Sequence, residues 1–132
     1  MLELYRERFP ATAAAVRLSR HGVIDALVQD GVSDQALLAD VALAVSEAAT
    51  NAVRHAYPAD SADGHLDVTL IRTPDSLIVT VKDDGAGMNA HSDAHGLRLG
   101  LAIMNSQTER LQIESDTTGT TVTLHFTAPE RR

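Results

Sequence analysis

The sequence contains no cysteine and no tryptophan, and it has only 2 tyrosines and 2 phenylalanines. Without cysteine, disulfide scaffolds, thiol catalysis and cysteine-ligated zinc sites are excluded. The few aromatic residues are scattered, so they offer no stacking platform for nucleic-acid bases. The formal net charge of −7 gives no overall attraction to nucleic acid or to anionic lipid. We therefore expect no direct nucleic-acid partner.

Long apolar runs are also absent. No window approaches roughly 18 uninterrupted apolar residues, and no basic-then-apolar segment at the N-terminus suggests export. The chain has 132 residues, of which 44% are hydrophobic and 22% are charged, and this length is typical of one domain. These features predict a single acidic domain over residues 1–132, cytoplasmic and without a membrane partner.

The first part of the chain predicts an edge strand followed by a helix. Apolar residues alternate loosely up to Pro10, which ends the strand. From Thr12 onward they recur at three-to-four spacing, which indicates a helix, and Gly31 occupies the position of its C-terminal cap. Ser33 can cap the next helix, with Asp34 in its first turn.

The most regular segment is this second helix, which we expect over roughly residues 34–57, ended by Pro58. Two adjacent apolar rows run along it, formed by Leu37, Val41, Ala44, Ala48 and Ala52 and by Leu38, Ala42, Val45, Ala49 and Val53. Spacings of seven, four and three residues return to nearly the same face. The polar residues therefore share one narrow stripe, which consists of Asp40, Glu47, Asn51 and Arg54.

Two hairpins are expected in the remainder. Alternating apolar residues predict strands over 66–70 and 77–81, and a final hairpin over 111–113 and 122–126 with Gly119 in its turn. Because the strands come in hairpin-like pairs, they do not follow the strict strand-helix-strand order of a doubly wound parallel sheet. We predict an α/β fold of the α+β kind, a two-layer sandwich of a mixed, mostly antiparallel sheet with helices on one face.

Two further segments complete this prediction. A glycine-rich loop leads into a short helix, expected from Leu101 to about Thr108. The tail from Pro129 to Arg132 is expected to be frayed.

The first candidate site lies on the long helix. Glu47 and Asn51 are one helical turn apart, so their side chains point to the same place. A carboxylate and a carboxamide together suit a hard cation such as Mg²⁺, or one positioned water. The alternative is an ordinary solvated helix face.

The second candidate is the segment Asp83-Asp84-Gly85-Ala86-Gly87, which directly follows a predicted strand. Glycines let the backbone approach a flat ligand closely. The carboxylate of Asp83 can accept a hydrogen bond from an exocyclic amine such as that of adenine. A plain turn is the alternative, because Asp-Gly is common in turns.

Two glycine-containing segments follow. The run from Gly96 through Arg98 to Gly100 and Leu101 opens a helix, and free N–H groups at a helix N-terminus form a phosphate site; such glycines can also merely shape a loop. The segment Gly119-Thr120-Thr121-Val122 begins a strand and can equally be a hairpin turn.

In the order of these segments the chain resembles the GHKL ATPase superfamily, over residues from about Arg17 to Phe126. The string Val45–Tyr57 is similar to the N-box of the bacterial anti-sigma-factor serine kinases. The resemblance implies a Bergerat-type ATP-binding fold. It also implies the residues that contact the nucleotide, which are Asn51, Arg54, Asp83, Gly85, Gly87, Gly96, Arg98, Gly100, Leu101 and Thr120.

The resemblance further implies individual roles. Asn51 would hold Mg²⁺ and through it the phosphates, Asp83 would bind the adenine amino group, and Glu47 would be the general base. Arg98 stands where many members have the middle glycine of the phosphate loop, and the lid of 8 residues, Met88–His95, is short.

The resemblance also implies a function: an ATP- and Mg²⁺-dependent anti-sigma factor and serine kinase. It would phosphorylate a serine of an anti-anti-sigma (STAS) protein and sequester a sigma factor, and the family also implies a homodimer. The alternative is a nucleotide-dependent partner-binding switch without phosphotransfer. A detached ATP-binding module of a histidine kinase is a third interpretation.

Overall fold

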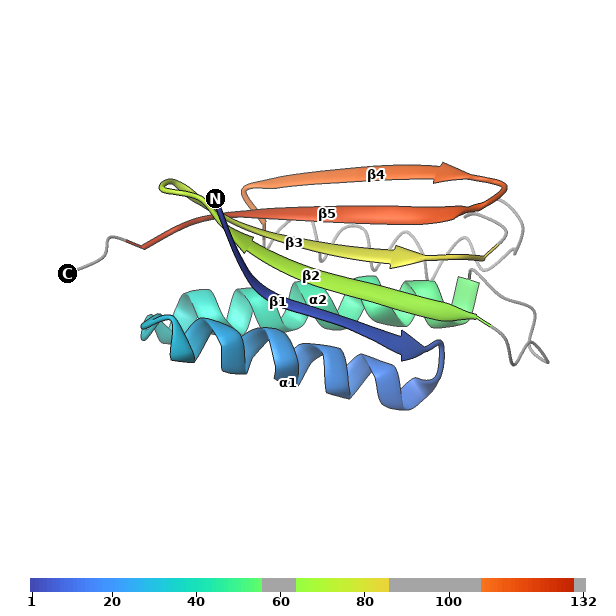
Figure 1. Cartoon of the computed structure of the whole chain (residues 1–132), viewed down its shortest axis with the longest axis horizontal. Helices are drawn as coiled ribbons and strands as arrows, with labels where there is room; N and C mark the ends of the chain where they lie inside the picture. The colour runs from blue at the N-terminus through green and yellow to red at the C-terminus, as the bar shows by residue number, and fades with distance from the viewer. Residues whose placement is uncertain (56–63, 86–107, 130–132) are drawn as a thin grey trace.

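The computed structural model describes residues 1–55, 64–85 and 108–129. Their elements are, in order, β1 (Leu2–Pro10), α1 (Ala13–Gln29), α2 (Gln35–His55), β2 (His65–Arg72), β3 (Ser76–Asp83), β4 (Arg110–Asp116) and β5 (Gly119–Thr127). The strands form one sheet in the order β1-β2-β3-β5-β4, and each neighbouring pair is antiparallel. Both helices lie on the same face of this sheet (Figure 1). The predicted two-layer α+β sandwich is confirmed, with an antiparallel sheet in the described part of the chain.

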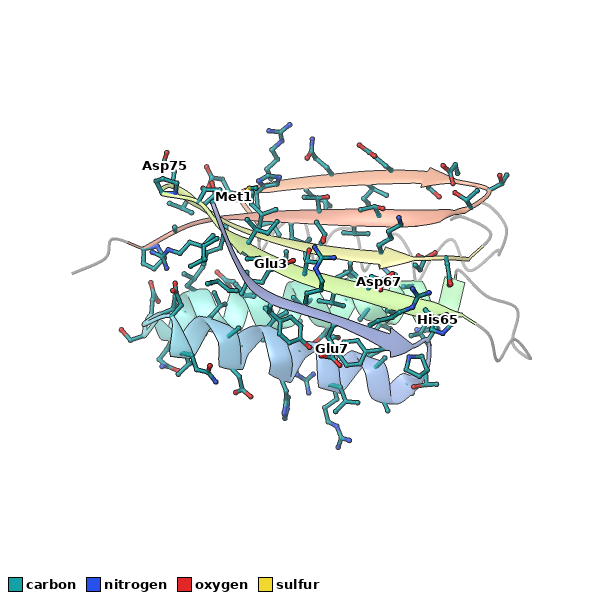
Figure 2. All side chains as sticks on the ribbon, viewed as in Figure 1. Met1, Glu3, Glu7, His65, Asp67 and Asp75 are labelled. Atoms are coloured by element: carbon teal, nitrogen blue, oxygen red, sulfur yellow. The ribbon has the colours of Figure 1, made fainter. Side chains whose placement is uncertain are left out.

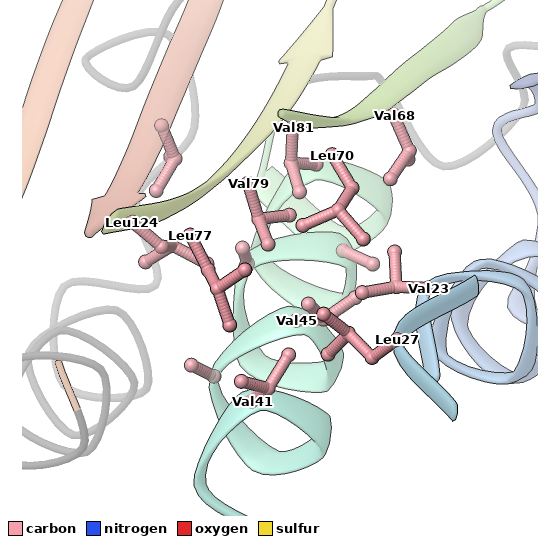
Figure 3. Close-up of a cluster of buried hydrophobic side chains, with 14 of the residues drawn as sticks. Val23, Leu27, Val41, Val45, Val68, Leu70, Leu77, Val79, Val81 and Leu124 are labelled. Atoms are coloured by element: carbon pink, nitrogen blue, oxygen red, sulfur yellow. The ribbon is translucent and has the colours of Figure 1, made fainter. Parts of the chain in front are cut away.

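The core lies between the sheet and the helices (Figure 3). α1 packs mainly on β1 and β2, whereas α2 packs on β3 and β5 and against α1. The buried side chains of α2 come from both predicted apolar rows and are Leu38, Val41, Ala44, Val45, Ala48, Ala49 and Ala52. Opposite them, the inward-facing residues of the central strands are fully or nearly fully buried: Leu66, Val68, Leu70, Leu77, Val79, Val81 and Leu124. The inward-facing residues of the alternating strands and the apolar face of the helix therefore form the two sides of one core layer.

By length and composition alone, α2 could cross a membrane: the segment Gln35–Arg54 has a mean hydropathy of 1.4. The core helix of a soluble protein can have the same length and apolar composition. Because the apolar side of α2 packs on α1 and the sheet, packing in the core accounts for its composition.

The C-terminus of α1 is closed as the sequence predicts. Gly31 has a φ of +96°, a conformation that glycine adopts without steric cost. Its N–H donates to the carbonyl of Val28 at 3.0 Å, and the N–H of Val32 donates to the carbonyl of Leu27, also at 3.0 Å. These are the two bonds of a Schellman motif, which turns the chain sharply toward α2.

The N-terminus of α2 differs from the prediction by one residue. Asp34, not Ser33, caps the helix, because its Oδ1 accepts the N–H groups of Ala36 at 3.0 Å and Leu37 at 3.2 Å. Both residue types are good caps. The ionised carboxylate of Asp34 also interacts favourably with the positive end of the helix dipole.

A buried ion pair holds the chain at the C-terminal end of β2. Arg72 contacts Asp30 at 2.7 Å, and its second guanidinium nitrogen donates to the carbonyl of Pro129 at 2.9 Å. Pro129 is therefore tied to the fold, and the expectation that the tail frays from this residue is wrong there. Arg72 is the reason, since a buried guanidinium needs more acceptors than one carboxylate. Residues 130–132 lie outside the described part of the chain.

The final hairpin is confirmed, but its turn is not centred on Gly119. Asp116 pairs with Gly119, so Thr117 and Thr118 form the two-residue loop and Gly119 opens β5. Asp116 Oδ1 accepts the N–H of Thr118 at 2.8 Å and its hydroxyl at 2.6 Å. The short helix expected from Leu101 lies outside the described residues, apart from Thr108, which is not helical.

Candidate functional site

Candidate residues from three distant segments come together at one end of the sandwich. The C-terminal end of α2, the end of β3 and the start of β5 all lie at this end (Figure 1). They contribute Asn51, Asp83 and Thr120, respectively. The antiparallel topology causes this, because β3 runs in the same direction as α2 and β5 returns from the same end.

Asp83 is the best defined of these residues. It is the last residue of β3, its exposed fraction is only 4%, and it is paired in register with Thr120. Its Oδ1 accepts two backbone N–H groups, from Gly85 at 3.0 Å and from Thr120 at 3.2 Å. Within the described part of the chain, its Oδ2 receives no hydrogen bond. One oxygen is thus fixed by the fold, and the other has no partner among the described residues.

The pKa of the Asp83 carboxyl is raised above its ordinary value of 3.8. Burial is the main cause, and the nearby charge of Asp84 adds to it, whereas the N–H groups of Gly85 and Thr120 lower the pKa. A carboxylate that is desolvated in this way has an unmet demand for a hydrogen-bond donor.

Thr120 and Gly119 support Asp83 from β5. The Thr120 side chain is 5% exposed, and its hydroxyl lies 2.8 Å from that of Ser115 on β4. Gly119 has a φ of +149°, and a Cβ added there would lie 2.1 Å from the carbonyl oxygen of Asp83. From the sequence, Gly119 was expected in a hairpin turn or at the start of a strand, and it was not named as a site residue. Its position directly before Thr120 was the available signal.

Glu47 and Asn51 lie one turn apart on α2, and both residues are half-buried. The Nδ2 atom of Asn51 is buried and has no hydrogen-bond partner among the described residues. An unpaired buried amide costs free energy, so a wholly solvated helix face does not describe this position. Arg54, one turn further, is exposed.

The side-chain oxygens of Asn51 and Glu47 suit Mg²⁺ bound together with a nucleotide better than they suit a metal ion held by protein ligands alone. Within residues 1–55, 64–85 and 108–129, no three His, Cys, Asp or Glu side chains gather to hold a metal ion. Mg²⁺ does not need such a cage, because it is usually held by one or two protein oxygens, by waters and by substrate phosphates. Asn51 and Glu47 supply amide and carboxylate oxygens of this kind.

The remaining predicted contacts fall outside the described residues. These are Gly87, Gly96, Arg98, Gly100 and Leu101, together with the lid Met88–His95. They stay predictions. Of the predicted nucleotide contacts that the structure describes, it brings Asp83, Gly85 and Thr120 into direct contact with one another.

Comparison with known proteins yields a matching family. Residues 9–126 match the family described as the histidine kinase-like ATPase domain. Two curated relatives, both named serine-protein kinase RsbW and both from Bacillus licheniformis, are 33% and 32% identical over 100 residues. The matched regions cover 64% of this chain and 61% and 62% of the two relatives. The chain thus spans less than two thirds of their length.

Solved structures show the same fold. The RsbU and RsbW domains of a Mycobacterium tuberculosis protein match with a TM-score of 0.72 and 26% identity, covering 96% of this chain and 34% of that one. The histidine kinase domain of a blue-light activated histidine kinase from Erythrobacter litoralis matches with a TM-score of 0.58 and 25% identity, covering 89% and 61%.

Proposed function

The chain belongs to the histidine kinase-like ATPase family, and from this membership we propose that it binds ATP with Mg²⁺ and acts as an anti-sigma-factor serine kinase. The observation that carries the proposal is the buried Asp83 carboxylate, with Oδ1 held by two backbone N–H groups. The similarity to proteins named serine-protein kinase RsbW supports the kinase activity.

Asp83 recognises the adenine ring. Its Oδ2 accepts a hydrogen bond from the exocyclic amine, while Oδ1 stays on Gly85 and Thr120. A bond from a donor to an ionised, desolvated acceptor is about twice as strong as a neutral one. Because the backbone already fixes the carboxylate, little side-chain entropy is lost when the ring binds.

Asn51 holds the metal side of the ligand. Its carboxamide oxygen would bind Mg²⁺, and its buried Nδ2, which lacks a partner in the described part of the chain, can donate to a phosphate oxygen. When bound, Mg²⁺ neutralises the charge that develops on the phosphates during transfer. At a net charge of −7, the protein needs such cations, and Arg54 and Arg98 add two more.

Glu47 acts as the general base. Its carboxylate takes the proton from a serine hydroxyl of the partner protein as the serine oxygen bonds to the γ-phosphorus. The bond between the γ-phosphorus and the bridging oxygen breaks, and ADP leaves. Phosphoryl transfer depends mostly on positioning and charge neutralisation, so one oriented carboxylate is sufficient protein chemistry.

The proposed partners are a STAS-domain anti-anti-sigma protein, which is the phosphoacceptor, and a sigma factor, which the chain sequesters in the cytoplasm. A homodimer would be compatible with both interactions. No direct contact with nucleic acid is proposed, consistent with the acidic balance of 18 Asp and Glu against 11 Lys and Arg.

The test is transfer of labelled γ-phosphate from ATP to a candidate STAS protein, with an acceptor variant that lacks the target serine as the control. Label on the wild-type acceptor alone supports the kinase. If the chain binds ATP and captures the partner but transfers no label, it is a nucleotide-dependent binding switch instead. If it binds no ATP, the whole proposal fails.

A further inference from the structure

Two consecutive aspartates lie where β3 ends, Asp83 as its last residue and Asp84 directly after it, and each accepts a backbone N–H from a different neighbouring strand. Asp83 accepts from Thr120 on β5 at 3.2 Å, and Asp84 accepts from His65 on β2 at 2.8 Å through its own Oδ1. His65 is the first residue of β2 and lies at the same end of the sheet (Figure 2). The end of β3 is thus tied to the strands on both of its sides.

The Asp84 bond joins β2 to the chain just beyond the end of β3. Leu66 is paired with Asp83, so His65 lies opposite Asp84. β3 ends at Asp83, and at this point the main chain leaves the ladder. The carboxylate of Asp84 accepts the N–H of His65 at this point, so a side chain supplies the acceptor where the main chain of β3 no longer does. The chain can therefore turn away immediately after Asp83 without leaving that donor unpaired.

The surroundings of Asp84 reinforce this contact. Its Oδ2 lies 3.3 Å from Nδ1 of His65 and 3.7 Å from a guanidinium nitrogen of Arg8 on β1. Arg8 also lies 3.9 Å from Asp67 of β2. All of these side chains are substantially exposed, so the charge contacts themselves contribute little. The backbone bond to His65 is the specific interaction.

We propose that Asp84 is a positioning residue for the nucleotide site: its bond to His65 sets the direction in which the chain leaves β3. That direction fixes where Asp83 presents its Oδ2 and where Gly85 meets the ligand. Asp84 itself does not contact the adenine ring. The inference rests on the proposed ATP site and adds a residue to it.

The experiment compares two aspartates that accept backbone N–H groups through Oδ1: Asp84, beside the proposed site, and Asp34, at the start of α2. Asp84→Ala removes an acceptor of one backbone N–H beside the site, and Asp34→Ala removes the acceptor that caps the start of α2. Affinity for a fluorescent ATP analogue and the free energy of unfolding are measured for both variants. Asp84→Asn is the third variant, because it keeps an oxygen that can accept from His65.

We expect Asp84→Ala to raise the ATP dissociation constant by about tenfold, the effect of losing one well-placed hydrogen bond. Asp34→Ala lowers stability but leaves the dissociation constant unchanged, and Asp84→Asn restores tight binding. Wild-type affinity in Asp84→Ala, or an equal loss in Asp34→Ala, overturns the inference.

Two further outcomes are decisive. If Asp84→Ala does not fold, Asp84→Glu replaces it, since it keeps the charge but moves the oxygens outward by one methylene; wild-type affinity in that variant overturns the inference. If the wild-type chain itself binds no ATP, the proposed function is wrong, and the inference about Asp84 is then wrong as well.

Discussion

Asp83 and Thr120 are separated by 37 positions in the sequence, yet the N–H of Thr120 donates to Oδ1 of Asp83 at 3.2 Å. The same oxygen accepts the N–H of Gly85 at 3.0 Å. One carboxylate oxygen therefore joins β3 to β5 and closes the turn that follows β3. In the proposed ATP site, Oδ1 serves the fold and Oδ2 serves the ligand, so a mutation can separate the two roles.

The variant Asp83→Asn should separate the role of Asp83 in the fold from its role in ATP binding. Asparagine can keep an oxygen on Gly85 and Thr120, but it places an NH₂ group where the adenine amine needs an acceptor. We expect ATP affinity to fall by about 10- to 150-fold, equivalent to about 1.5–3 kcal/mol for a hydrogen bond to a charged group. Calorimetric titration measures the affinity, and thermal melting checks that the fold is intact. If both are unchanged, Asp83 does not belong to the site.

The raised pKa of Asp83 predicts a specific pH dependence of stability. As pH rises above the ordinary value of 3.8, the unfolded chain releases this proton first, while the buried carboxyl still holds it. The contribution of Asp83 to the free energy of unfolding is therefore full below 3.8 and declines as pH rises through the folded pKa. Urea unfolding from pH 3.5 to 7 should show the wild type losing stability relative to Asp83→Asn, because the other carboxyl groups are common to both proteins. Parallel curves would contradict the assignment.

Gly119→Ala tests the close approach behind Asp83. The added Cβ meets the Asp83 carbonyl at 2.1 Å, and the φ of +149° disfavours any side chain. We expect a loss of about 1–3 kcal/mol in stability and weaker ATP binding, because Asp83 must move. Gly31→Ala is the matched control: its φ is also positive, at +96°, but nothing lies within 4 Å of the new Cβ. That control should lose stability and retain ATP affinity.

Much of the fold was predictable because the local patterns agree with the packing. Alternation in residues 66–70 and 77–81 gave the central strands, and the apolar rows of the long helix gave the buried side of α2. The cap of α2 was misplaced by one residue because Ser33 and Asp34 are both good caps. Pattern alone does not rank two adjacent candidates.

The site was predictable in its residue types but not in its connections. Asp83 could be named from its glycine neighbours, whereas the use of its Oδ1 by Thr120 depends on a strand pairing that no local pattern reveals. The same holds for the bond from His65 to Asp84 and for the contact of Gly119 with Asp83. The buried Nδ2 of Asn51 required knowledge of how α2 packs.

Asn51→Ala should lose function without losing stability. In the described part of the chain its Nδ2 makes no hydrogen bond, and alanine favours a helix more than asparagine does. The nucleotide-free variant should therefore unfold within about 1 kcal/mol of the wild type. Mg²⁺-dependent ATP affinity and phosphotransfer should both fall, which titration with and without Mg²⁺ measures. A wild-type Mg²⁺ dependence would remove Asn51 as a ligand.

Glu47→Gln should fail in a different way, although Glu47 lies on the same helix face one turn earlier. Glutamine keeps the shape and polarity of the side chain but cannot take a proton at neutral pH. ATP should still bind with nearly wild-type affinity, while transfer to the STAS serine drops by about 10²–10⁴-fold, the usual loss when a general base is removed. Single-turnover transfer at saturating ATP isolates this step from binding, and Asn51→Ala provides the contrast because it weakens both. Transfer at the wild-type rate in Glu47→Gln would show that another group accepts the serine proton.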